Sequence, residues 1–371
     1  MLLVAETMDW NTLKSLKLSL QATNLNATIT YSLTKNIERA SMEKEIVENL
    51  WNGDSEAQIQ AAMELSRLCN KQKLKLAENG VMVPLVSMLH SENYEVIEAS
   101  LCAFLSLSFG SDRNKIRIVR YGVLPILLNL LHCESQTAIQ LSLAAMLILS
   151  SCKANKVAIA SSGAVKILVT YINNSSNTHT QSQLDAIATL HNLTTCQEII
   201  PLIVSSGVIF SLLELIHGSV KSSLLAEKAI GLLENIVSSS ESALCEAAST
   251  GGAIRILVET IEDGSSLGKE HAVGILLLIC QSCREKYRVL ILTDGVMPGL
   301  LQLSVDGTWR AKSVAGELLF LLRDCSSYSS RRKQINHKLI EQMMEEIDAE
   351  GDKLADTTLR LVEEMIAKLN T

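Results

Sequence analysis

The chain has 371 residues, of which 47% are hydrophobic, 4% aromatic and 20% charged, with only 4 prolines. An interior built from aliphatic side chains and Met, with few helix-breaking residues, predicts an all-α protein. The net charge of -7 and the pI near 5.6 argue against a nucleic-acid partner, because binding to phosphate backbones requires clustered Lys and Arg.

The cysteines and the apolar segments indicate the compartment. The 9 cysteines are odd in number and irregularly spaced, which favours reduced thiols over a disulfide framework. The first residues include Glu6 and Asp9 and lack the basic segment of a signal peptide. The uncharged span 135–152 contains an unbroken apolar run only over 143–149, too short to cross a bilayer. We expect a cytoplasmic and/or nuclear protein with no membrane span.

Residues 1–40 precede the regular part of the sequence. Leu13, Leu16 and Leu20 have the spacing of a short amphipathic helix, whereas residues 24–34 are polar and rich in turn formers. We expect an N-terminal cap and a flexible segment here. The sequence Ser55-Glu56-Ala57-Gln58 has the spacing of a capping box and predicts a helix that begins near Ser55.

A glycine followed by Val or Ala and then an apolar helical pattern recurs through residues 41–330. The intervals between these glycines are 42, 41, 44, 45 and 43 residues. We expect each glycine at a helix junction, where a residue able to adopt positive φ is useful. The glycines are Gly80, Gly122, Gly163, Gly207, Gly252 and Gly295.

A longer helical pattern between the glycines also repeats, and its positions align in three columns. The first column is large and apolar: Leu65, Phe104, Met146, Leu190, Leu233, Leu276 and Leu318. The second, three residues later, reads Leu68, Leu107, Leu149, Leu193, Ile236, Ile279 and Leu321. The third, four residues before the first, reads Ala61, Ser100, Ser142, Ala186, Ala229, Ala272 and Val314. Buried stripes with small residues one turn earlier are typical of helices packed closely against their neighbours.

Periods of about 40–47 residues with two or three helices mark armadillo or HEAT arrays. We therefore predict an armadillo-type α-solenoid, a right-handed superhelix of about seven repeats over residues 41–330.

Three segments carry a more specific resemblance. Residues 155–160 (NKVAIA), 162–169 (SGAVKILV) and 190–194 (LHNLT) resemble the armadillo repeats of plant U-box ubiquitin ligases and their relatives. The resemblance covers roughly residues 41–330 and implies protein binding. The U-box, which would recruit the ubiquitin-conjugating enzyme, has no counterpart in residues 1–40 or after residue 330, so we do not expect ligase activity.

Armadillo repeats that bind extended peptides often carry an asparagine ladder on the helix that lines the groove. The matching column here reads Arg67, Ser106, Ile148, Asn192, Asn235, Leu278 and Phe320. Four residues earlier, where import receptors of this fold place tryptophans, the column reads Met63, Cys102, Ala144, Ala188, Gly231, Gly274 and Gly316. The missing tryptophans argue against the import-receptor mode.

The groove-lining helices supply the candidate partner-binding site. Asparagine side chains can donate to and accept from an extended backbone, and nearby charged groups can pair with partner side chains. The alternative is that the two asparagines bond to neighbouring backbone within the solenoid. The candidate residues are Asn192, Asn235, Asp185, Lys228, His191 and His271.

Two motifs resemble catalytic or metal sites but lack the required context. Residues 264–268 match G-x-S-x-G, yet a nucleophile elbow needs a preceding strand and a helical pattern precedes this one. Cys280 and Cys283 form a lone C-x-x-C near a helix end, without the further ligands of a zinc site. We therefore predict no enzyme activity, no cofactor and no metal, and keep a hydrolase that uses Ser266 only as a control hypothesis.

Residues 331–371 change in character. Arg331, Arg332, Lys333 and Lys338 form a small basic cluster, either a nuclear-localisation signal or simply solvated charge. Two amphipathic patterns separated near Gly351 follow. We expect them to cap the solenoid, with a partner-binding helix as the alternative.

These observations predict a non-catalytic scaffold or adaptor that binds other proteins, as extended segments or helices, along the concave solenoid face. The alternative is a substrate-recognition component of a ubiquitin ligase pathway. Partner identity and oligomeric state stay open.

Overall fold

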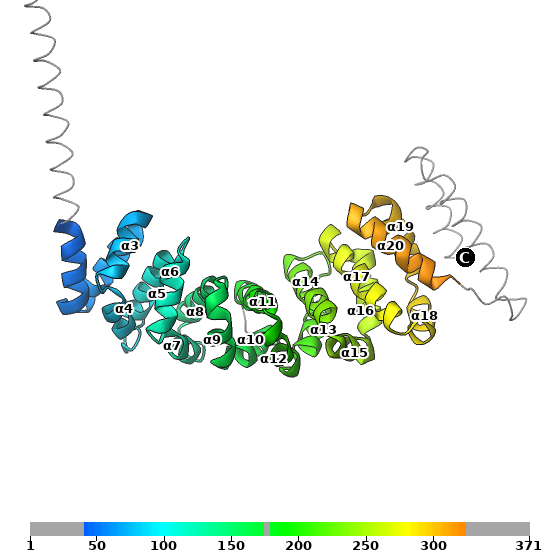
Figure 1. The fold of residues 1–371 in the computed structure, drawn as a ribbon, viewed down its shortest axis with the longest axis horizontal. Coiled ribbons are helices and arrows are strands. Elements are labelled where there is room, and N and C mark those ends of the chain that lie inside the picture. The colour runs from blue at the N-terminus through cyan, green and yellow to red at the C-terminus, as the bar shows by residue number, and fades with distance from the viewer. Residues whose placement is uncertain (1–40, 174–178, 324–371) are drawn as a thin grey trace, which may run out of the picture. The chain divides into compact units, whose positions relative to one another are not determined.

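The computed structural model describes residues 41–173 and 179–323, and all regular secondary structure in these ranges is helical (Figure 1). The predicted all-α fold is confirmed. The chain divides into two compact units, Met1–Val123 and Leu124–Thr371. The predicted N-terminal cap, the basic cluster and the C-terminal capping helices lie outside the described residues.

The first unit opens, in its described part, with helical residues 41–52. The helices that follow are α2 (Ser55–Arg67), α3 (Asn70–Glu78), α4 (Met82–Met88), α5 (Tyr94–Ser108) and α6 (Asp112–Arg120). The long helices α2 and α5 pack against each other, and α4 packs against α5. One long helix therefore stacks on the next, as expected for repeats that bury their apolar faces by stacking.

Helix α2 begins at Ser55 as predicted, but its cap lies one residue earlier. The Asp54 carboxylate accepts a hydrogen bond from the Ala57 backbone N–H at 2.9 Å. The predicted capping box at Ser55 was wrong because Asp is as good an N-cap as Ser and its negative charge also suits a helix N-terminus.

The second unit repeats a triplet of two shorter helices and one long helix. Its elements are α7 (Val123–Leu130), α8 (Gln136–Ser150), η1 (Lys153–Asn155), α9 (Lys156–Ser161), α10 (Ala164–Asn173), α11 (Thr180–Thr194), η2 (Gln197–Ile199), α12 (Ile200–Ser205), α13 (Val208–Gly218), α14 (Leu224–Ser239), α15 (Glu241–Ser249), α16 (Ala253–Asp263), α17 (Ser266–Ser282), α18 (Arg284–Thr293), α19 (Met297–Asp306) and α20 (Trp309–Leu322).

The long helices of this unit form one layer and the middle helices of the triplets form another (Figure 1). Helices α8, α11, α14, α17 and α20 each contact the next in the series, and we call them the third helices. The second helices α10, α13, α16 and α19 do the same. The apolar core lies between the two layers.

The predicted core columns are buried. No member of the first column exceeds 2% exposure. The second column is buried from Leu107 to Ile279, and the small column from Ala61 to Ala272. Only Leu68, Leu321 and Val314, at the first or last positions of their columns, are partly exposed.

The repeat glycines occupy the junctions that precede the second helices, as predicted. All six adopt positive φ, from 78° to 91°. At Gly207, for example, φ is 78° where the chain turns from α12 into α13, a left-handed conformation that costs a side-chain-bearing residue about 1 kcal/mol or more.

A buried asparagine links consecutive helices in each unit. In the first unit, Asn114 on α6 donates from its side-chain amide to the Leu107 carbonyl near the end of α5, at 2.8 Å. In the second unit, Asn155 donates to the Leu149 carbonyl of α8 at 3.2 Å. These bonds satisfy carbonyls in the last turn of a helix, which lack an intrahelical donor.

No single described helix combines the length and apolar composition that a membrane crossing requires; three pairs of consecutive helices meet the criteria only jointly, each bent by more than 40° at its break.

We predict that Asn114→Ala destabilises the fold by about 1–3 kcal/mol, because the Leu107 carbonyl loses its donor in a buried site. Thermal unfolding followed by circular dichroism measures the effect. Asn70→Ala is the matched control, since Asn70 lies exposed at the start of α3. Equal melting temperatures for the two variants would contradict the structural role of Asn114.

Candidate partner-binding surface

All six predicted site residues lie on three neighbouring third helices of the second unit. Helix α11 carries Asp185, His191 and Asn192, helix α14 carries Lys228 and Asn235, and helix α17 carries His271. Because α11 contacts α14 and α14 contacts α17, the residues lie on one continuous layer, but they differ in accessibility.

The two ladder asparagines have different surroundings. The Asn192 amide donates to the Ser150 hydroxyl at 3.0 Å and to the Leu147 carbonyl at 3.4 Å, both on α8. The partly exposed side chain of Asn235 has no hydrogen-bond partner in the described part of the chain. Asn192 thus has the intramolecular role that we left open, whereas the side-chain amide of Asn235 is not used within the described residues.

Asp185 faces the interior more than the solvent. The residue is 8% exposed and its carboxylate accepts a hydrogen bond from the Gln181 side chain at 2.8 Å. Burial raises the pKa of Asp185, although the bond from Gln181 acts in the opposite direction. Its burial leaves Asp185 little surface for a partner.

His191 and Lys228 are both exposed. The Lys228 ammonium lies 3.1 Å from the carboxylate of its neighbour Glu227. Partial burial lowers the pKa of His191, and the nearby positive groups His271, Lys156 and Lys228 lower it further. The lowered pKa favours the neutral form of the His191 imidazole.

A charged network that sequence reasoning missed spans α14, α17 and α20. Glu234 accepts hydrogen bonds from His271 Nδ1 and from Arg310 Nη2, each at 2.6 Å. Arg310 Nη1 donates to Glu270 at 2.9 Å. These bonds to Glu270 and Glu234 raise the pKa of Arg310 above its usual value. One guanidinium thus bridges two carboxylates from two helices.

Two glycines provide the space for this network. A Cβ atom on Gly274 would lie 2.3 Å from Glu234 Oε1, and one on Gly231 would lie 3.2 Å from His271 Nε2. A Cβ on Gly316, in the same column of the next repeat, would meet no atom within 4 Å. The position that holds tryptophans in import receptors is therefore a glycine in α14 and in α17, because the side chains of His271 and Glu234 occupy the adjacent space.

Helix caps hold two further carboxylates. The Ser265 hydroxyl accepts from the Gly268 N–H at 3.0 Å, which caps α17, and donates to Glu227 at 2.8 Å. Thr308 caps α20 in the same way and donates to Glu270.

The hydrogen bonds to these two carboxylates change their ionisation. Burial alone would raise the pKa of Glu227, but the bonds from Ser265 and Lys228 bring it below its usual value. Burial alone would also raise the pKa of Glu270, but the bonds from Thr308 and Arg310 bring it below its usual value. Both side chains are therefore held as carboxylates.

The motifs that resembled catalytic or metal sites have structural positions. Helix α16 ends at Asp263 and α17 begins at Ser266, so the G-x-S-x-G segment runs from a short connection into the first turn of a helix, and a helix rather than the strand of a nucleophile elbow precedes it. Cys280 is buried, which raises the pKa of its thiol, and Cys283 is exposed. Within the described ranges, no group of three or more His, Cys, Asp or Glu could hold a metal ion.

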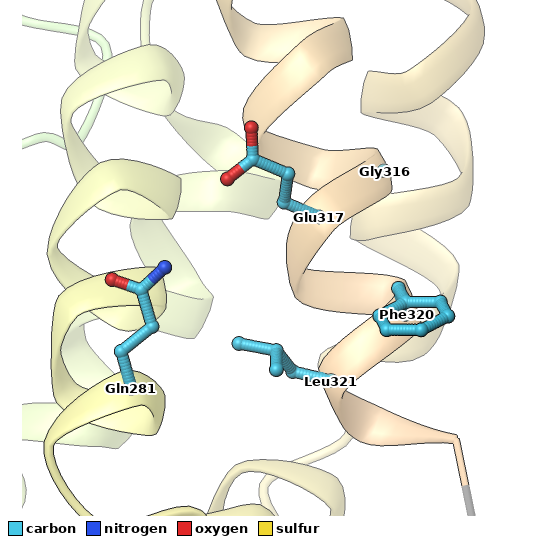
Figure 2. Close-up of a pocket in the computed structure, with 5 residues that line it drawn as sticks. All are labelled: Gln281, Gly316, Glu317, Phe320 and Leu321. Carbon is cyan, nitrogen blue, oxygen red and sulfur yellow. The ribbon is translucent and has the colours of Figure 1, made fainter.

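A shallow hollow lies between α17 and α20, with a volume of about 360 Å³. In Figure 2, Gln281 of α17 and Leu321 of α20 lie on facing sides of it. Phe320, at the asparagine-ladder position of α20, is 65% exposed and also lines the hollow. This end of the layer offers apolar rather than polar contact. The hollow is lined by Gln281, Gly316, Glu317, Phe320 and Leu321.

Comparison with known proteins gives relatives over part of the chain. The chain is 30% identical over 179 residues to U-box domain-containing protein 45 of Arabidopsis thaliana, covering 47% of this chain and 22% of that protein. It is 29% identical over 126 residues to U-box domain-containing protein 1 of Medicago truncatula, covering 34% of this chain and 18% of that protein. The chain thus spans about a fifth of the length of these relatives. No family model matches it.

Solved structures establish the fold. An engineered protein from the Northeast Structural Genomics Consortium superposes with a TM-score of 0.69 and 22% identity, covering 88% of this chain and 79% of that one. A designed armadillo repeat protein, solved in complex with the peptide (KR)4, superposes with a TM-score of 0.52 and 18% identity, covering 64% of this chain and 98% of that one. The predicted armadillo-type solenoid and the resemblance to plant U-box proteins are both confirmed.

We predict that Gly274→Ala lowers the melting temperature by about 2–4 °C relative to Gly316→Ala. Both substitutions raise helix propensity by about 1 kcal/mol. Only the Gly274 variant displaces Glu234 from His271 and Arg310. Differential scanning calorimetry of the two proteins tests this, and a Gly274 variant as stable as its Gly316 counterpart would contradict the role of the network.

A second prediction concerns Asp185. Because its folded-state pKa is raised, the fold binds this proton more tightly than the unfolded chain does, and ionisation destabilises the fold. Asp185→Asn keeps an acceptor for Gln181 and should raise the melting temperature by about 1–2 °C at pH 7.

The gain should disappear as the pH falls below the ordinary Asp value of 3.8, where both states are protonated. Melting curves of both proteins between pH 3 and pH 7, the range over which an ordinary Asp ionises, measure it. A difference that is independent of pH would contradict this account.

Proposed function

We propose that the chain is a non-catalytic interaction scaffold or adaptor that binds an extended segment of a partner protein across α11, α14 and α17. The observation that carries the proposal is the free amide of Asn235 on the third-helix layer. Lys228 lies seven residues earlier on α14, two helical turns away and thus on the same side of the helix. A backbone-binding group and a charged group therefore address the same surface.

The chemistry of Asn235 suits such a partner. A side-chain amide can donate to a backbone carbonyl and accept from a backbone N–H, which is how an extended segment without its own sheet satisfies its polar groups. The structural neighbour in complex with the peptide (KR)4 supports peptide binding by this fold. The hollow beside Phe320 on α20 adds a place for an apolar side chain at one end of the layer.

The second candidate is a substrate-recognition component of a ubiquitin ligase pathway. It is supported by the 30% identity to a U-box domain-containing protein over 179 residues. In this version, the partner bound on the third helices is a substrate, and ubiquitin is conjugated to it by a catalytic domain on another chain. For either version we propose a cytoplasmic or nuclear location, on the basis of the unpaired cysteine pattern.

We predict that Asn235→Ala weakens partner capture about tenfold while leaving the melting temperature within about 1 °C of wild type, because no internal bond is lost. Asn192→Ala should instead lower the melting temperature by about 2–4 °C, because the bonds to Ser150 and Leu147 are lost. Partners identified by affinity capture and mass spectrometry, then titrated by surface plasmon resonance, supply the binding measurement.

The opposite pattern, with binding lost in the Asn192 variant alone, would contradict the proposed surface. A ubiquitin-conjugating enzyme or ligase among the partners that depend on Asn235 would favour the second candidate.

A further inference from the structure

We propose that the exposed face of α6, together with the adjoining face of α3, binds the surface of a bilayer that contains anionic phospholipids. The inference concerns the first unit and is independent of the partner-binding surface proposed on the third helices of the second unit. It adds peripheral membrane attachment to the proposed scaffold function.

Basic side chains form matching stripes on α3 and α6. Both belong to the first helices, the short helices that end just before a repeat glycine. At nine and five residues before that glycine, α3 carries Lys71 and Lys75, and α6 carries Arg113 and Arg117. Arg120 continues the stripe on α6, since residues three or four apart share one face of a helix. The side chains of Lys75 and Arg113 are 59% and 67% exposed.

The two stripes adjoin and keep an excess of positive charge. Glu78, the last residue of α3, lies 2.7 Å from Arg113 and 3.5 Å from Arg117, so one carboxylate serves two guanidinium groups (Figure 1). Asp112 pairs with Lys115 at 2.8 Å. Together α3 and α6 carry seven basic and two acidic side chains. Their basic residues without an ion pair in the described part of the chain are Lys71, Lys73 and Arg120.

Neighbouring carboxylates offset part of this charge on α3. Helical residues 41–52 contact α3 through Glu43, which lies 2.6 Å from Lys75, and they also carry Glu45 and Glu48 in exposed positions. Helix α6 is therefore the centre of the proposed site.

The basic stripes are not a requirement of the repeat. The same two positions in the first helices of the second unit hold mostly small or apolar residues, with one Glu and one Lys. In chain order the pairs are Ala154 and Ala158, Glu198 and Leu202, Ala243 and Ala247, and Lys286 and Leu290. Since these repeats stack without the stripe, stacking does not account for it in the first unit.

Exposed aromatic side chains flank α6 at both ends. Phe109, in the turn before α6, is 72% exposed, and Tyr121, directly after its last residue, is 46% exposed. Other repeats hold polar or small residues at these positions. They are Asn70, Ser151, Thr195, Ser238, Gln281 and Arg323 for Phe109, and Asn79, Ser162, Ser206, Gly251 and Asp294 for Tyr121. Basic residues beside exposed aromatic rings are typical of surfaces that lie at the level of lipid headgroups.

A bilayer fits this face better than an acidic peptide does. To bind Arg113 and Arg117 together, a carboxylate of a peptide would have to displace Glu78, which costs the bonds already made. An anionic bilayer instead attracts the summed charge of the stripes, and no internal ion pair has to break. The aromatic rings of Phe109 and Tyr121 can enter the headgroup region at the same time.

Co-sedimentation of the full 371-residue chain with vesicles tests the proposal. One set of vesicles contains phosphatidylcholine alone, and the other also contains about 30% phosphatidylserine, which gives a negative surface potential. We expect at least about tenfold tighter binding to the phosphatidylserine vesicles. Raising the salt from about 0.1 M to about 1 M should remove most of this difference, because the Debye length falls from about 10 Å to about 3 Å.

A double variant locates the binding to the stripes. Lys71→Gln with Arg120→Gln removes two basic groups that have no ion pair in the described residues, so the fold should keep its stability. Binding to phosphatidylserine vesicles should weaken about tenfold. The matched control is Lys166→Gln with Lys312→Gln, which makes the same change in net charge at exposed lysines of α10 and α20. The control should change binding less than about twofold.

A second variant tests the aromatic contact. Phe109→Ala should weaken binding to the same vesicles about fivefold, because the ring no longer enters the headgroup region. Phe210→Ala is the matched control, since Phe210 is 55% exposed on α13 of the second unit, and it should leave binding unchanged.

The inference is overturned if the chain binds neither set of vesicles, if it binds both equally, or if the Lys71 and Arg120 variant behaves like its control. Fluorescence anisotropy with a labelled Glu-rich peptide examines the competing occupant. Binding of that peptide that depends on Lys71 and Arg120, without binding to vesicles, would assign an acidic protein partner and also overturn the inference.

Discussion

The close approach of neighbouring third helices is the constraint on which the rest of the second unit depends. Each helix buries its large apolar column only when the next helix covers it, and the small column, such as Ala229 and Ala272, permits that approach. No single repeat could bury this surface alone. The second helices stack on one another in the other layer, and the positive-φ glycines let the chain turn into each of them.

Close stacking also determines the chemistry of the exposed side. Glycines at 231 and 274 leave room for His271 and Glu234 to cross between helices, and Arg310 completes the network. The carboxylates of α14 and α17 are thereby used in holding repeats together. The side-chain amide of Asn235, by contrast, has no hydrogen-bond partner in the described part of the chain.

Much of the fold could be predicted because repetition makes the signal redundant. The column from Leu65 to Leu318 identifies buried positions in seven helices at once, and the interval of the glycines identifies the junctions. For the candidate site, the sequence predicted which helices carry the residues but not which side chains are accessible. Whether Asn192 or Asn235 is free depends on Ser150, an individual neighbour one repeat away, and the Glu234–Arg310 pair joins residues 76 positions apart. No periodicity encodes such pairings, although the change to glycine in the column at residues 231 and 274 was a signal that something other than tryptophan occupies that space.

The central claim is that partners bind on the third helices rather than on the second helices. Hydrogen–deuterium exchange of the full chain, with and without a captured partner, tests it directly. The account predicts slower exchange in peptides from α11, α14 and α17 when the partner is bound, with α10, α13 and α16 unchanged. Protection confined to α10, α13 and α16 would contradict it.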